Sequence, residues 1–284
     1  MKFRRKIKLF IVLMLSIMTA SSALAVTNSI YAVSVDNTNI YEIDVTTGAV
    51  TPVTTSSFAS ISLACDGTYA YYWNTENPSH RGLTKWDPLT NSHTLIDATD
   101  VSEENATVDS LGNIWILDTT RSYVDGSIGT EDTCKLYKVD KTNGDRIDTY
   151  TLPDVGGYAT GDIAWGPDGK KLYISTDNPN YGYGNDYNYV WDRTDPTNIV
   201  IKGGVYYAGL VWVNDKLYGS RANLTNGTGV IYELNPTDFS EIALVATMPL
   251  GVTAGDLSNA VPEPATICLL GLASIALFKK QKRK

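Results

Sequence analysis

The stretch IYEIDVTTGAVTPV, which spans Ile40–Val53, combines a short strand with a tight turn. Apolar and aromatic residues alternate up to Asp44, as they do in a strand that lays one face against a neighbouring sheet. An Asp that ends a strand accepts hydrogen bonds from the backbone amides just ahead of it, and Gly48 supplies the positive φ of a tight hairpin. The stretch therefore predicts two antiparallel strands joined by a turn.

The same unit returns four more times along the chain. The further copies are LTKWDPLTNSHTLI (Leu83–Ile96), LYKVDKTNGDRIDTY (Leu136–Tyr150), YVWDRTDPTNIVI (Tyr189–Ile201) and IYELNPTDFSEIALV (Ile231–Val245). The polar residues that close the first strand of each copy are Asp44, Asp87, Asp140, Asp192 and Asn235, at spacings of 43, 53, 52 and 43 residues. A supersecondary unit repeated at such a period indicates a repeat architecture.

A second pair of short strands precedes the four later units, and turns rich in Asp, Asn and Gly join the two members of each pair. The first members are Ile61–Ala64, Thr107–Asp109, Ile163–Trp165 and Leu210–Val213. Each repeat then holds four antiparallel strands, which is the blade of a β-propeller.

The two ends of this repeat array complement each other. The first unit has only Ile30–Val35 ahead of it, whereas Val252–Leu257 stands alone after the fifth. The sequence therefore predicts an all-β fold, a five-bladed β-propeller over residues 26–260 in which the C-terminal strand completes the N-terminal blade and removes its open edge. A pair of β-sandwiches and a solenoid are the alternatives.

Composition and charge narrow the class of protein. Of 284 residues, 43 % are hydrophobic and 19 % are charged, which is typical of a globular protein. Five basic residues lie within residues 1–8 and five within residues 279–284. Without these ten and Glu263, the interior has 13 basic and 30 acidic residues, a net charge of −17. Such a surface repels nucleic acid and anionic lipid, so no nucleic-acid partner is expected.

The N-terminus has the three parts of a secretory signal peptide over residues 1–25. Basic Met1–Lys8 precedes the apolar run LFIVLMLSIMTA (Leu9–Ala20), and Ala23 and Ala25 form a small-x-small cleavage site. An apolar run of 12 residues is shorter than the roughly 20 that span a bilayer. The sequence predicts cleavage after Ala25 and export, and an uncleaved anchor is the alternative.

The C-terminus, residues 261–284, is also tripartite: Val261-Pro262-Glu263-Pro264, the apolar run ATICLLGLASIALF and a basic end. As a helix the 14 apolar residues would cover about 21 Å of a hydrocarbon core about 30 Å thick. Snorkelling lysines or local thinning of the bilayer would bridge the difference. We expect a short transmembrane helix before any processing, with the basic end on the cytoplasmic side.

This tail resembles the PEP-CTERM sorting signal of bacterial exported proteins, with Pro262, Glu263 and Pro264 as the motif residues. The resemblance implies recognition and processing by exosortase, an integral-membrane transpeptidase, in a bacterium with an exopolysaccharide-rich envelope. A simple C-terminal anchor is the alternative. In the body, PDGKKLYIST (Pro167–Thr176) and Asp44–Gly48 resemble the repeats of YVTN-type and related quinoprotein-like propellers.

Long loops between the second and third strands of the blades would all project from one face of the propeller, where binding usually resides. The segment DNPNYGYGNDYNY (Asp177–Tyr189) is one of them. Its Tyr181, Tyr183 and Tyr187 are predicted ligand-binding residues, because tyrosine rings offer flat surfaces for stacking on sugars. Its Asp177, Asn178 and Asp186 could hold a hard cation such as calcium. A solvated loop without a ligand is the simpler interpretation.

The sequence predicts no catalytic residues. His80 and His93 are the only histidines, and no Gly-x-Ser-x-Gly, His-Glu-x-x-His or P-loop motif is present. Export permits a disulfide, but the expected positions of Cys65 and Cys134 favour buried, unpaired thiols.

The functional prediction that follows is an exported, non-catalytic surface or extracellular-matrix protein that binds or scaffolds exopolysaccharide or envelope proteins. A hydrolase or lyase that uses carboxylates or calcium is the alternative, and a purely structural spacer is a third hypothesis.

Overall fold

A computed structural model describes residues 28–34, 38–55, 60–74, 82–96, 105–119, 123–124, 127–128, 134–153, 161–176, 187–222 and 227–260. Contacts divide the chain into two units, and all of these residues belong to the unit that spans Thr27–Val261. The regular elements in the described ranges are strands. The signal peptide and the sorting tail lie outside them.

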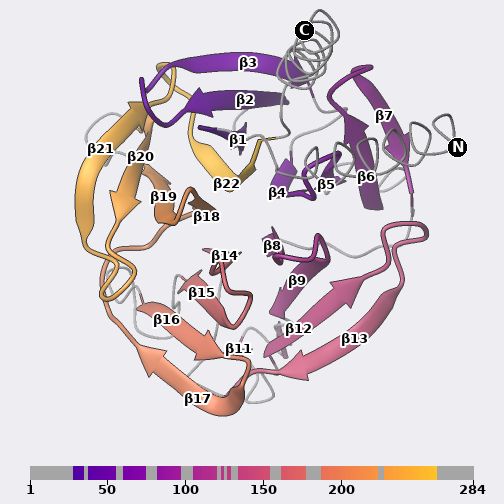
Figure 1. The fold of residues 1–284 in the computed structure, drawn as a ribbon, viewed down its shortest axis with the longest axis vertical. Helices are drawn as coiled ribbons and strands as arrows, with labels where there is room; N and C mark the ends of the chain where they lie inside the picture. The colour runs from indigo at the N-terminus through magenta and orange to yellow at the C-terminus, as the bar shows by residue number, and fades with distance from the viewer. Residues whose placement is uncertain are drawn as a thin grey trace, which may run out of the picture. The chain divides into compact units, whose positions relative to one another are not determined.

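Twenty of the strands form five four-stranded antiparallel sheets, arranged as blades around a central axis (Figure 1). From the innermost strand outward, the blades are β22(Ala254–Asn259)-β1(Ser29–Ser34)-β2(Asn39–Asp44)-β3(Val50–Thr55), β4(Ser60–Cys65)-β5(Ala70–Asn74)-β6(Gly82–Asp87)-β7(Ser92–Leu95), β8(Asn105–Val108)-β9(Ile114–Thr119)-β12(Cys134–Val139)-β13(Arg146–Thr151), β14(Gly161–Trp165)-β15(Lys171–Thr176)-β16(Tyr187–Asp192)-β17(Asp195–Ile201) and β18(Gly209–Val213)-β19(Lys216–Ala222)-β20(Gly229–Leu234)-β21(Glu241–Thr247). The predicted five-bladed propeller is confirmed.

The C-terminal strand closes the ring, as predicted. Strand β22 pairs antiparallel with β1, with Ile30 opposite Asn259 and Ala32 opposite Leu257. It forms the innermost strand of the first blade and packs against β18 and β4 of the two adjacent blades. At Gly209 of β18, a Cβ atom would lie only 2.3 Å from the carbonyl oxygen of Gly255, so glycine is required for this approach. The strand begins two residues later than the sequence indicated.

Turn chemistry explains why the five units look alike in sequence. The side chain of Asp44 accepts hydrogen bonds from the amides of Thr46 (2.8 Å) and Thr47 (3.1 Å). The four other closing residues each accept an N–H from the residue two positions ahead. The positive φ expected of a tight hairpin is present at Gly48 and at its counterparts Asn91 and Gly144.

The fifth unit departs from this pattern. Its turn places Phe239 at a φ of 60°, a conformation that is uncommon for a bulky residue. The phenyl ring is buried beside Tyr173, with 5.9 Å between the ring centroids, and the hydroxyl of Tyr207 donates to the Phe239 carbonyl (3.1 Å). Packing and this hydrogen bond therefore hold a backbone conformation that the local sequence does not favour.

Aromatic side chains pair across the spaces between blades one and two, three and four, and four and five. Their ring centroids lie 5.2 to 5.8 Å apart, and the pairs are Tyr31–Trp86, Trp115–Trp165, Tyr150–Trp191 and Tyr173–Trp212. Each pair joins consecutive blades in a tilted or edge-to-face arrangement, which the ring quadrupoles favour. Aromatic residues alternate along the strands because one face of each sheet must cover its neighbour.

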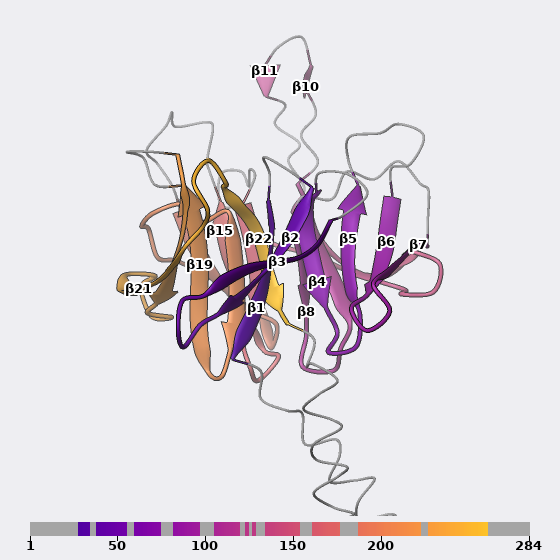
Figure 2. The same cartoon turned by 90° about the horizontal axis from the view of Figure 1, so that it is seen from above.

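The antiparallel order separates the connections onto two faces. We call the face that holds the connections between second and third strands the long-loop face, and the opposite one the short-turn face (Figure 2). On the long-loop face, the connection between β9 and β12 contains a small hairpin of β10(Tyr123–Val124) and β11(Ser127–Ile128). Between these strands the sequence is Asp125-Gly126, a common hairpin-turn dipeptide that could have predicted it.

Candidate functional site

Polar side chains occupy one level of the innermost strands, at the centre of the ring. Each innermost strand contributes one residue to this level, three positions before its last paired residue. These residues are Ser62, Asn105, Asp162, Leu210 and Asp256. All five are buried, and four are polar. Buried polar groups need partners, and two acidic side chains among them make this level the most unusual part of the described chain.

Backbone amides of neighbouring blades point at the two carboxyl groups. Asp256 on β22 is completely buried, and its Oδ2 accepts a hydrogen bond from the Leu63 amide of β4 (2.6 Å). Asp162 on β14 is 1 % exposed, and its Oδ2 accepts from the Leu210 amide of β18. Its Oδ1 accepts from the Ile163 amide (2.7 Å). Each carboxyl group therefore ties its strand to a neighbouring blade.

Burial dominates the acid–base properties of this pair. It raises the pKa of Asp162 to about 7, against the opposing effect of the hydrogen bond that this carboxyl group makes with Asp256. It also raises the pKa of Asp256 well above the usual range, and the negative charge on Asp162 raises it further. Of the two carboxyl groups, Asp256 therefore holds a proton more strongly than Asp162 does.

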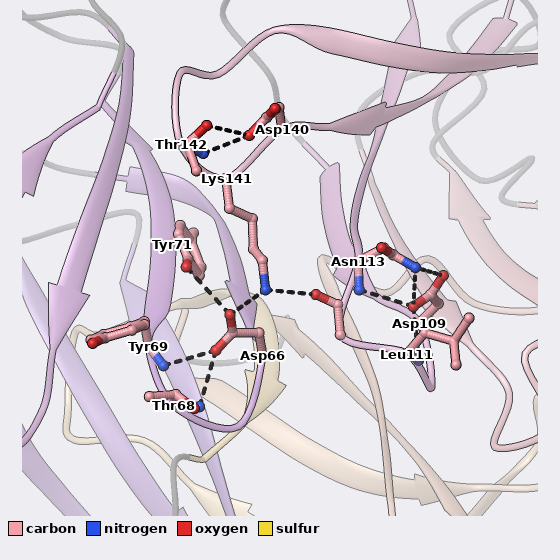
Figure 3. Close-up of polar contacts among 11 residues, drawn as sticks. Asp66, Thr68, Tyr69, Tyr71, Asp109, Leu111, Asn113, Asp140, Lys141 and Thr142 are labelled. Carbon is pink, nitrogen blue, oxygen red and sulfur yellow. Dashed lines mark hydrogen bonds and ion pairs between the residues drawn. The ribbon is translucent and has the colours of Figure 1, made fainter.

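A second polar cluster joins blades two and three on the short-turn face (Figure 3). The ammonium group of Lys141 lies 2.6 Å from Oδ2 of Asp66 and donates to the Gly112 carbonyl (3.0 Å). The hydroxyl of Tyr71 donates to the same Asp66 oxygen (3.3 Å). Asp109 beside them accepts from four different donor groups, the amides of Leu111 and Asn113 and the side chains of Asn113 and Trp115. The cluster is therefore a structural clasp between turns.

We expect the clasp to contribute to stability. Burial alone would raise the pKa of Asp66, but Lys141 and the amides of Tyr69 and Thr68 outweigh it and hold that pKa below its usual 3.8. We expect Lys141→Met to lower the free energy of unfolding by about 1 kcal/mol at pH 7, a few degrees in Tm. Because a lowered pKa stabilises the folded state only above it, the difference in Tm should vanish as Asp66 becomes protonated in acid. Thermal unfolding from pH 2 to 7 checks this, and a difference unchanged at pH 2 would contradict it.

Two hollows on the described surface are formed by residues of several strands. One, about 230 Å³, lies where the inner strands meet the short-turn face, and the other, about 330 Å³, lies on the outer wall between blades four and five. Indole rings and polar side chains line the first, among them Trp165, Trp212, Asn214, Asp215 and Asn259. Both are smaller or more open than a typical small-molecule pocket.

Only one of the three tyrosines that the sequence singles out lies in the described residues. Tyr187 opens strand β16 rather than belonging to a loop, and it is half-buried, with its ring 6.1 Å from that of Tyr189. Tyr181 and Tyr183 lie outside the described residues, as do the cation ligands proposed from the same segment. Ala23, Ala25 and the motif residues Pro262, Glu263 and Pro264 lie outside them too. Their predicted roles stay predictions.

Other chemically notable side chains have structural partners. Cys65 is buried and free, as predicted, and burial raises its pKa. His93 lies on the outer strand β7 with its ring parallel to that of Trp86 and its Nδ1 3.0 Å from the Tyr72 hydroxyl. Burial lowers the pKa of His93, so the neutral imidazole belongs to the packing. In the described ranges, no group of three or more His, Cys, Asp or Glu side chains could hold a metal ion.

Comparisons with solved structures agree with this architecture. A chain in the crystal structure of a nidogen/laminin complex aligns with a TM-score of 0.53 at 12 % identity, covering 81 % of this chain and 97 % of that one. TolB from Acinetobacter baumannii aligns with a TM-score of 0.48 at 15 % identity, over 81 % of this chain and 54 % of that one. At 12 % identity the likeness to the first chain concerns the fold alone, and the TolB alignment adds nothing to it. The fold defines a β-propeller protein.

The tail supplies the more specific assignment. Residues 260–284 match the family model of the PEP-CTERM protein-sorting motif. The protein is thus an exported propeller that carries a PEP-CTERM signal, which marks it for the cell envelope or surface and implies exosortase as its processing partner. A search of curated protein sequences finds no match. No helix within the described ranges is long and apolar enough to cross a membrane.

Proposed function

We propose that this protein is a non-catalytic binding protein of the cell surface or extracellular matrix, and that its long-loop face binds extracellular polysaccharide. The observation that carries the proposal is the position of the two ends of the propeller. The amide of Ala260 donates to the Ser29 carbonyl (3.2 Å), and the side chain of Asn28 accepts from that of Asn214 in a turn of the short-turn face (2.9 Å). Both ends therefore leave from the short-turn face.

This arrangement favours binding at the opposite face. The sorting tail follows Ala260 in the sequence, so the chain continues into it from the short-turn face. The connections between second and third strands begin and end on the opposite face, where a rigid ring of sheets supports them. The short-turn face is built instead from compact turns whose carboxylates are occupied by backbone amides.

Charge and residue type indicate the class of ligand. The interior of the chain carries a net charge of −17, which disfavours polyanions and suits a neutral polysaccharide. Tyr187 is the first residue of β16 and lies at the end of that strand nearest the long-loop face. Tyr181 and Tyr183 precede it in the sequence of the same connection. Tyrosine rings can stack on the apolar faces of sugar rings while their hydroxyls hydrogen-bond, a combination that suits neutral glycans.

The test is affinity for neutral polysaccharide extracted from the producing cells, measured with the exported protein. We expect the double substitution of Tyr181→Ala and Tyr183→Ala to weaken binding about tenfold, since each stacked ring contributes about 0.5–1.5 kcal/mol. Leu111→Ala is the control, because Leu111 is 81 % exposed on the short-turn face. Equal loss in the control, or glycan turnover that a chelator abolishes, would contradict the proposal.

A further inference from the structure

The closing strand β22 is fastened at the centre of the ring by side chains as well as by sheet pairing. Oδ2 of Asp256 accepts from the Leu63 amide, and Oγ of Ser258 accepts from the Cys65 amide (2.8 Å), so two bonds lead to β4. On the other side, the Ser220 hydroxyl donates to the Gly255 carbonyl (2.8 Å). Strand β22 therefore depends on groups from both adjacent blades.

Asp162 and Asp256 meet across this centre from blades that are not adjacent. Three of their four carboxyl oxygens accept backbone N–H groups. The fourth, Oδ1 of Asp256, is buried and has no hydrogen-bond donor within reach in the described structure. The Asp162 carboxyl group lies close enough to the Asp256 side chain to form a hydrogen bond if one of the two carries a proton. Two ionised carboxylates in a dry interior would repel strongly, so one of them must be neutralised.

We propose that Asp162 and Asp256 share a single proton at the centre of the ring, and that this proton locks the closing strand β22 in place. The proton turns a repulsive contact between two carboxylates into a charge-assisted O–H···O⁻ hydrogen bond, which is stronger than a neutral one. Its loss places two negative charges between β22 and β14 and weakens the closure of the propeller. Alkaline pH therefore weakens the pairing of β22 that closes the ring.

A proton suits this position better than a metal ion does. The N–H groups of Leu63, Ile163 and Leu210 direct partial positive charge at three of the oxygens that a cation would need. Cations such as calcium take six to eight oxygen ligands, and N–H donors aimed at those oxygens oppose them. A shared proton needs only the remaining oxygen of Asp256 and one lone pair of Asp162.

Few other ionisable groups come from the strands packed against β22 and β14. These strands are β1, β4, β8, β15, β18 and β19, and their ionisable side chains are Tyr31, Cys65, Lys171, Tyr173, Lys216, Tyr218 and Arg221. Among them Cys65 interacts electrostatically with Asp256, and its thiol stays protonated because burial raises its pKa. Lys216 and Arg221 form ion pairs with Glu233 and Glu241. The two acids therefore govern the charge at the centre.

The direction of the pH dependence follows from the raised pKa values of both acids. The folded state holds its proton at pH values where the unfolded chain, with an Asp pKa near 3.8, has already released it. The stabilisation is therefore complete below about pH 3.8 and falls as the pH rises, through about 7, the pKa of Asp162, toward the higher pKa of Asp256, where the shared proton itself is lost. We expect the Tm of the full chain to fall by about 5 °C or more between pH 5 and pH 9.

The decisive variant is Asp256→Asn, which replaces the shared proton with a permanent N–H donor of the same shape. Its Tm should vary much less with pH, so that it melts below the natural protein at pH 5 and above it at pH 9. Asp168→Asn is the matched control, because Asp168 is an exposed residue in the turn that follows β14. It should keep the pH dependence of the natural protein.

Two further measurements keep the proposal testable if Asp256→Asn does not fold. Infrared spectra of the natural protein at pH 7 should contain the band of a protonated carboxylic acid that disappears at high pH. Amide hydrogen exchange at Leu63 and Leu210, corrected for its intrinsic pH dependence, should accelerate over the same range. Parallel pH profiles for Asp256→Asn and the natural protein, no protonated-acid band, or a Tm at pH 9 that rises with calcium and falls with a chelator would overturn the proposal.

Discussion

A chain that ends at Thr253 is expected not to form the propeller at all, because it lacks β22. The loss removes the inner strand of the first blade and uncovers β1, β4 and β18. Leu257 alone is buried to 2 % exposure, and truncation of a buried Leu to Ala costs about 2–5 kcal/mol. The whole unfolding free energy of a domain is only about 5–15 kcal/mol. The loss of all the buried contacts of β22 therefore removes more stability than the remaining strands can provide.

The matched control is a chain that ends at Ala260, which keeps every paired strand. It should unfold cooperatively with the Tm of the full chain, whereas the chain ending at Thr253 should lack a cooperative transition and be digested rapidly by protease. A synthetic peptide of residues 254–260 should restore the transition when added to the shorter chain, because it can pair with β1. Equal Tm values for the two truncated chains would show that ring closure does not require β22.

The blades could be predicted from the sequence because their signals are local. Asp44 accepts hydrogen bonds from the amides of Thr46 and Thr47, and Gly48 supplies the positive φ, so the turn involves residues only two to four positions apart. Closure of the ring could be predicted as well, since an incomplete first blade and a solitary last strand need each other. Phe239 shows the limit, because a buried contact with Tyr173 imposes its backbone conformation.

The central acid pair could not be found in the same way, because Asp162 and Asp256 come from blades far apart in the sequence. A signal was present nevertheless. Gly161-Asp162-Ile163 and Gly255-Asp256-Leu257 are the same Gly-Asp-aliphatic sequence, placed where innermost strands are expected. An acid inside an otherwise apolar strand indicates a buried polar partner. The partner itself, like the ion pair of Asp66 with Lys141, requires the three-dimensional arrangement of the turns.

The second large effect concerns the sorting tail, whose removal should change the location of the protein while leaving its fold intact. Sheet pairing ends at Asn259, and Ala260 is the last residue hydrogen-bonded to the propeller. Deletion of Val261–Lys284 therefore leaves every strand in place. It removes the apolar run and the five cations that can hold the chain at a membrane. We expect this chain to be exported, to melt like the full chain, and to appear entirely in the soluble fraction.

Substitutions in the motif should instead trap the unprocessed chain. Pro262 and Pro264 restrict the backbone to extended conformations and Glu263 places one charge between them, so an enzyme can recognise both shape and charge. Replacement of all three by Ala should abolish processing by exosortase and leave a full-length, membrane-associated precursor, detected by mass and by cell fractionation. Val261→Ala is the adjacent control and should be processed normally. A tail-deleted protein that stayed with the membrane would contradict the role of the apolar tail in attachment.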